Sequence, residues 1–209
     1  MQYIIGIDFD NTIICYDDIF HNIAVEKQLI PKMVPKSKES VRDYLRNIGK
    51  EAIWTELQGY VYGKRMREAT AYPGVIDFIT SAIKKQFIIY IISHKTRHPY
   101  LGPQYNLHAA AYDWLDYNGF FDSNQIGLNI KHVFFEHSLD EKLKRINDMN
   151  CCYYIDDLPE LFLRENFPSD VNKILFYPHQ TNLLKHKNTN EYLAFSSWQD
   201  INFYLLNNK

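Results

Sequence analysis

Residues Tyr3–Thr12, with the sequence YIIGIDFDNT, join a short apolar run to two aspartates two positions apart. The run Tyr3–Ile7 is β-branched and almost continuously apolar, which is typical of a buried parallel strand. If the strand continues through Phe9, Asp8 and Asp10 project from the same face at its carboxyl end. Ligands of open α/β sheets bind at that end. Two carboxylates so close repel each other, and an oxygen-seeking cation such as Mg²⁺ relieves the repulsion.

The composition indicates a folded protein with a substantial core. Of 209 residues 46% are hydrophobic, which excludes a disordered chain, and the net charge of −2 gives no indication of nucleic-acid binding. The three cysteines have no metal-binding spacing, so we expect reduced thiols and a cytoplasmic location. No apolar run reaches the ~18 residues that cross a membrane. We expect no secretion signal, no membrane or nucleic-acid partner, and a monomer or homodimer.

Two further apolar runs end in polar residues. Phe87–Ile92 is a predicted strand that leads into Ser93, and Cys151–Ile155 is another that leads into Asp156 and Asp157. Helical periodicity separates these strands, and this alternation predicts a doubly wound parallel α/β sheet. A further short strand region is expected within residues 120–128.

The chain between the first two strands has a helical pattern. Apolar residues recur at helical spacing within residues 15–70, and Pro73-Gly74 marks a turn before the next helix. We therefore expect a core domain of residues 1–14 and 71–209, and a helical cap domain of residues 15–70 that covers the site.

The pattern Asp8-x-Asp10-x-Thr12 resembles the first motif of the haloacid dehalogenase (HAD) superfamily of phosphohydrolases. In that family the first Asp attacks phosphorus and the second is the general acid and base. Ser93 is similar in position to the second motif, a hydroxyl residue that holds the phosphoryl oxygens. The acidic pair at 156–157 resembles the fourth motif, which holds Mg²⁺. The structural alternative for the first motif is an acidic turn with Asn11 as the turn residue.

The third motif of the family is a lysine that neutralises the nucleophile and the phosphate. Lys142, near the start of a predicted helix, is the preferred candidate, with Lys144 and Lys131 as alternatives. Lysines on short helices are usually solvated, so the sequence leaves this choice open.

The resemblance implies a HAD-like, Rossmannoid fold with a small helical cap. It also implies a Mg²⁺-dependent phosphatase that acts on a small phosphorylated metabolite, of sugar phosphate or nucleotide type, through an aspartyl-phosphate. A phosphomutase of the same superfamily is the first alternative, and a non-catalytic HAD-like binding module is the second. The implied site comprises Asp8 and Asp10 for catalysis; Asp8, Asp10, Asp157 and Asp156 for the metal; Ser93, His94 and Lys142 for phosphate; Thr12 and Asn11 in support; and Lys95 and Arg97 as candidate substrate contacts.

Overall fold

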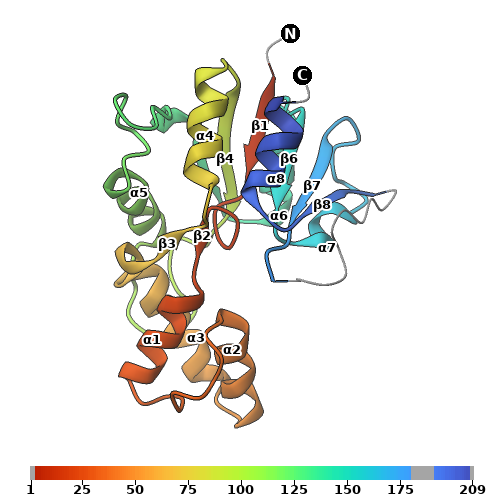
Figure 1. The fold of residues 1–209 in the computed structure, drawn as a ribbon. Coiled ribbons are helices and arrows are strands. Elements are labelled where there is room, and N and C mark those ends of the chain that lie inside the picture. The colour runs from red at the N-terminus through yellow and green to blue at the C-terminus, as the bar shows by residue number, and fades with distance from the viewer. Residues whose placement is uncertain (1–2, 180–190, 208–209) are drawn as a thin grey trace. The chain divides into compact units, whose positions relative to one another are not determined.

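The computed structural model describes residues 3–179 and 191–207, which divide between two compact units (Figure 1). The first unit comprises residues up to Ile13, Ala71–His94, and Gly119 onward. The second comprises Ile14–Thr70 and Lys95–Asn118. The sequence pattern predicts that Lys95–Asn118 belongs to the core domain. In the structure this segment belongs with the helical unit, where the indole of Trp114 donates a hydrogen bond to the carbonyl of Ala69 (2.8 Å).

A six-stranded parallel sheet forms the centre of the first unit, in the order β5-β4-β1-β6-β7-β8, and confirms the predicted α/β class. The chain adds β4 and β5 on one side of β1, then β6, β7 and β8 on the other. This reversal beside β1 creates a switch point at the carboxyl ends of β1 and β6. The strands are β1 (Ile4–Ile7), β4 (Ile88–His94), β5 (Val133–Glu136), β6 (Tyr153–Asp156), β7 (Asn172–Phe176) and β8 (Leu193–Phe195).

Helices cover both faces of this sheet, with α4 and α8 over one face and α6 over the other (Figure 1). The strand alternation explains how each face is filled. On β7, the ring of Phe176 lies 5.4 Å from that of Trp198 in α8, whereas Leu175 belongs to the opposite core cluster with Ile146 of α6. The helices are α4 (Val75–Lys84), α6 (Leu139–Asp148), α7 (Pro159–Phe162) and α8 (Trp198–Asn202), with a 3-10 turn at Ile130–His132 and a π-helical turn at Phe203–Asn207.

The second unit is mainly helical. Its core includes Phe20 and Trp54, whose ring centroids lie 5.0 Å apart, together with the buried Leu45. Two short strands, β2 and β3, pair with each other. The elements are β2 (Ile14–Cys15), α1 (Asp17–Glu26), α2 (Lys38–Asn47), α3 (Glu51–Gly63), a 3-10 turn at Met66–Glu68, β3 (Thr70–Ala71) and α5 (Leu107–Tyr117).

The prediction of a strand within residues 120–128 is wrong. This stretch, all of it described, forms turns, closed by hydrogen bonds from Gly127 N to Asp122 O (2.9 Å) and from Leu128 N to Phe120 O (2.8 Å). Phe120 and Leu128 are buried, so the apolar pattern predicted the burial of these side chains correctly and the strand conformation incorrectly. Within the ranges 3–179 and 191–207, we find no helix with both the length and the apolar character that a membrane crossing requires.

Candidate active site

The backbone after β1 places Asp8 beside the end of β6. The amide of Asp8 donates to the carbonyl of Ile155 (2.9 Å), and the chain then reverses through a turn closed by Ile13 N to Phe9 O (3.0 Å). Asn11 occupies the left-handed region of this turn with φ of +59°. Asparagine tolerates that conformation better than most residues, so the turn is locally encoded.

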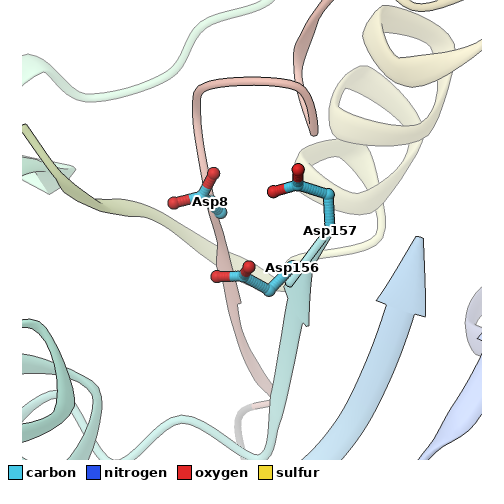
Figure 2. A group of neighbouring side chains, drawn as sticks. All are labelled: Asp8, Asp156 and Asp157. Carbon is cyan, nitrogen blue, oxygen red and sulfur yellow. The ribbon is translucent and has the colours of Figure 1, made fainter. Parts of the chain in front are cut away.

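Three carboxylates meet at the ends of β1 and β6. Asp8, Asp156 and Asp157 each present an oxygen within 4.8 Å of the others (Figure 2). The parallel register pairs Ile7 with Ile155, so Asp8 and Asp156 each follow a paired residue and leave the sheet at the same edge. Asp8 and Asp156 are buried, and Asp157 is half-buried.

Lys142 of α6 contacts two of these three carboxylates. Its Nζ lies 2.6 Å from Asp8 Oδ1 and 2.6 Å from Asp156 Oδ2, and its side chain is 2% exposed. The two alternatives from the sequence, Lys144 and Lys131, are exposed. Of these three lysines, the structure therefore brings Lys142 to the carboxylate of Asp8.

A capping box fixes the start of the helix that carries Lys142. Ser138 Oγ accepts from the amide of Glu141 (3.1 Å), and Glu141 Oε2 accepts from the amide of Ser138 (3.1 Å). Reciprocal capping of this kind satisfies two amides that have no partner within the helix. The cap thus determines where α6 begins, and with it the place of Lys142 in the first turn.

Thr12 connects the turn after β1 to the carboxylates. Its hydroxyl lies 3.4 Å from Asp8 Oδ2 and 3.4 Å from Asp157 Oδ1, and its side chain is fully buried. Its carbonyl accepts a hydrogen bond from the indole nitrogen of Trp198 (3.1 Å). Thr12 is therefore held from both its backbone and its side chain.

Burial and charge perturb the titration of this group. Burial raises the pKa of Asp8 to about 7, although the Lys142 ammonium acts in the opposite direction. Burial disfavours the ammonium of Lys142, but Asp156 and Asp8 outweigh this effect and raise its pKa, so Lys142 stays charged. Burial, followed by the charge of Lys142, lowers the pKa of His94.

The remaining site residues predicted from the sequence lie at several places. Ser93, at the end of β4, is 1% exposed and pairs with Phe135 of β5; His94 follows it as the last residue of the strand. Asp10 raises the pKa of Asp8 as a minor contribution after burial, but its carboxylate is not part of the three-carboxylate group. Lys95 and Arg97 belong to the second unit, where Lys95 Nζ lies 5.0 Å from the ring centroid of Tyr62.

The donor set fits a hard divalent cation. When all three carboxylates are ionised, the one ammonium leaves an excess of two negative charges, and all the donors are oxygens. Mg²⁺ prefers carboxylate, carbonyl and water oxygens. The chemistry of the residues therefore agrees with the metal that the resemblance implies.

Two supporting residues were not identified from the sequence. Tyr154 donates its hydroxyl hydrogen bond to the carbonyl of Ile92 (2.5 Å), just before Ser93, and its ring centroid lies 5.5 Å from Lys142 Nζ. Trp198 holds Thr12. Both are aromatic residues at apolar positions, and the sequence offers no signal that separates such residues from ordinary core.

The second unit contains a separate pocket of about 600 Å³. Its walls combine apolar side chains with two tyrosines and one charge of each sign. Lys27 Nζ already lies 4.1 Å from the ring centroid of Tyr60. The lining residues are Lys27, Leu29, Ile53, Glu56, Leu57, Tyr60, Pro103 and Tyr105.

Neither a protein-family model nor a curated protein matches this sequence. Among solved structures, it is similar to a HAD family hydrolase from Deinococcus radiodurans with bound phosphate and sodium (TM-score 0.58, 11% identity, 99% of this chain and 96% of that chain). It is also similar to the HAD-hydrolase candidate YfnB from Bacillus subtilis, bound to magnesium (TM-score 0.56, 15% identity, 99% and 100%). A third similar structure is a defluorinating L-2-haloacid dehalogenase (TM-score 0.54, 12% identity, 98% and 95%). This chain therefore has the fold of the HAD superfamily.

Proposed function

We propose that this protein is a Mg²⁺-dependent phosphatase that hydrolyses small phosphorylated metabolites through an aspartyl-phosphate on Asp8. The observation that carries the proposal is the environment of Asp8. Its carboxylate is buried at the switch point of the sheet, with Lys142 at 2.6 Å and the hydroxyl of Thr12 at 3.4 Å. A carboxylate nucleophile needs such fixed neighbours, because it must approach an anionic phosphate without being displaced.

Asp8 and Asp157 are the carboxylates that would hold Mg²⁺, together with the backbone carbonyl of Asp10 that the resemblance implies. When bound, the ion offsets the repulsion between the anionic nucleophile and the anionic phosphate. The magnesium in the YfnB structure and the phosphate in the Deinococcus structure support a metal and a phosphoryl group on this fold.

The chain's own residues supply the two chemical steps. An oxygen of Asp8 forms a bond to phosphorus while the bond from phosphorus to the leaving oxygen breaks, and Asp10 gives that oxygen a proton. Asp10 then takes a proton from water, whose oxygen attacks the aspartyl-phosphate, releases phosphate and restores Asp8. Lys142 and Ser93 bind the phosphoryl oxygens. Lys142 contributes a full positive charge and Ser93 a hydroxyl.

Asp10 favours phosphate over carbon–halogen chemistry. Both kinds of protein occur on this fold, because one similar structure is a dehalogenase. In the superfamily, branches that break carbon–halogen bonds lack the second Asp of the first motif. A halide leaving group needs no proton, whereas an alkoxide does, so a general acid at Asp10 assists cleavage of a phosphate ester and not of a carbon–halogen bond.

Release of phosphate from p-nitrophenyl phosphate, with Mg²⁺ or with EDTA, tests this function. We expect EDTA to abolish turnover and Asp8→Asn to reduce it by at least ~1,000-fold, since the nucleophile is lost. Asp148→Asn is the matched control, because Asp148 is an exposed aspartate at the end of α6. An Asp8→Asn protein with wild-type turnover would exclude Asp8 as the nucleophile. A panel of phosphorylated metabolites, with product analysis, then identifies the substrate and separates hydrolysis from phosphoryl transfer to a second hydroxyl.

A further inference from the structure

Both oxygens of Asp156 already have partners within the protein. Oδ2 lies 2.6 Å from the ammonium of Lys142, and Oδ1 accepts from the backbone amide of Leu158 (2.9 Å). The side chain is completely buried. Asp156 thus differs from Asp157, which is half-buried and whose Oδ1 lies 3.4 Å from the hydroxyl of Thr12.

These contacts make Asp156 a poor ligand for a dication. The ammonium of Lys142 lies 2.6 Å from one oxygen of Asp156 and 2.6 Å from one oxygen of Asp8, so the two aspartates differ in their second oxygen. In Asp8 this oxygen lies 3.4 Å from the hydroxyl of Thr12, whereas in Asp156 it accepts a 2.9 Å hydrogen bond from a backbone amide. Binding through Oδ1 would compete with the amide of Leu158, which directs the chain into α7. Asp8 and Asp157 therefore remain as the carboxylates suited to the ion.

The same contacts are suited to holding Lys142. A lysine has four rotatable methylenes, and its ammonium is held in one place only by its partners. Asp8 is one partner and Asp156 is the other, at equal distances of 2.6 Å. We propose that Asp156 is a positioning residue that fixes the ammonium of Lys142 at Asp8, and that Asp156 is not a ligand of the divalent ion.

This arrangement has a specific use in the reaction, and here the inference rests on the proposed function. When Asp8 forms the aspartyl-phosphate, one of its oxygens becomes an ester oxygen and its carboxylate charge is lost. Asp156 then remains as the fixed anionic partner of Lys142. The ammonium stays in place to bind the phosphoryl oxygens through both steps.

Magnesium titration by calorimetry on the full-length protein tests the metal half of the proposal. We expect Asp157→Asn to weaken Mg²⁺ binding by at least ~10-fold, the scale of effect that loss of a metal-site residue produces. Asp156→Asn should change the Mg²⁺ dissociation constant by less than ~3-fold, because Asp156 does not bind the ion. It should lower kcat by more than ~10-fold, because the ammonium of Lys142 is no longer held in place during phosphoryl transfer. A loss of Mg²⁺ affinity in Asp156→Asn equal to that in Asp157→Asn would make Asp156 a ligand and overturn the proposal.

A double-mutant cycle on the metal-free protein tests the positioning half. The variants are Asp156→Asn, Lys142→Met and the double substitution, compared by denaturant midpoint. If Asp156 holds Lys142, the double variant loses less stability than the two single losses combined. Additive losses would refute the pairing. Lys144→Met is the matched control, since Lys144 is an exposed lysine of the same helix, and it should show no coupling to Asp156→Asn.

The two measurements separate this inference from the proposed function. The metal-free cycle could show coupling while no substrate releases phosphate. That result would refute the proposed phosphatase function and leave the Asp156–Lys142 pairing intact. Conversely, phosphate release could depend on Asp8 while the stability losses in the cycle are additive. That result would support the phosphatase function and refute the pairing.

Discussion

The indole nitrogen of Trp198 donates a hydrogen bond to the carbonyl oxygen of Thr12 (3.1 Å), although 186 residues separate them in the chain. Trp198 is fully buried, and its ring packs 5.1 Å from that of Phe78. Thr12 in turn directs its hydroxyl toward Asp8 and Asp157. Helix α8 therefore holds the turn that follows Asp8, the candidate nucleophile, and that contains Asp10, the candidate general acid.

Substitution of Trp198 by Phe tests this connection. The change keeps an aromatic ring but removes the donor to Thr12, so we expect a loss of about 1–2 kcal/mol in the free energy of unfolding. The turn should also loosen, and kcat on an aryl phosphate should fall. Trp114→Phe is the matched control, because its indole donates to Ala69 in the second unit. It should cost similar stability with a smaller loss of kcat; equal losses of kcat in both variants would contradict the connection.

Magnesium affinity should depend on pH. Burial raises the pKa of Asp8 to about 7, so Asp8 is largely protonated below that pH and ionised above it. Mg²⁺ binds the ionised form, and protons compete with it. We therefore expect binding measured by calorimetry to tighten by about 10-fold between pH 6 and pH 8, as one titrating group requires. In Asp8→Asn this increase should disappear; an affinity of the wild type that falls as pH rises would refute the assignment.

Removal of the cap of α6 should affect both stability and activity. Ser138→Ala removes the oxygen that accepts from Glu141, and loss of an N-cap side chain costs about 1 kcal/mol of unfolding free energy. The first turn carries Lys142, so kcat should fall as well. Ser138→Asp restores a capping oxygen and should recover most of both. If Ser138→Asp behaves like Ser138→Ala, the cap is not the cause of the loss.

The hydroxyl of Tyr154 should contribute to stability beyond the packing of its ring. Tyr154→Phe removes the hydrogen bond to Ile92 (2.5 Å) inside the core, and we expect a loss of about 1–2 kcal/mol in denaturant unfolding. Tyr100→Phe is the control, because Tyr100 is 81% exposed, and it should change stability by less than about 0.5 kcal/mol. Unchanged stability in Tyr154→Phe would show that the hydrogen bond makes no net contribution.

Local sequence pattern determined the strands and their acidic ends. Continuous apolar runs before Asp8, Ser93 and Asp156 indicate buried parallel strands, and parallel strands bring their carboxyl ends to one edge. The structure places Asp8 and Asp156 at that edge, as this argument requires. Periodicity also predicted the helices of the second unit, because apolar spacing along one segment reports which face is buried.

Only the tertiary structure decided which partner each side chain of the site meets. Lys131, Lys142 and Lys144 are equivalent by residue type, and the packing of α6 places the ammonium of Lys142 at 2.6 Å from Asp8. Asp156 and Asp157 are adjacent in sequence, yet the first faces Lys142 and is buried while the second is half-buried.

The hydrogen bond from Trp198 to Thr12 and the place of Lys95–Asn118 in the helical unit were decided in the same way. Residue type and spacing carry the local propensity for a strand, a turn or a helix. The partners of a side chain depend on contacts between segments far apart in the chain, and those contacts exist only once the segments have packed.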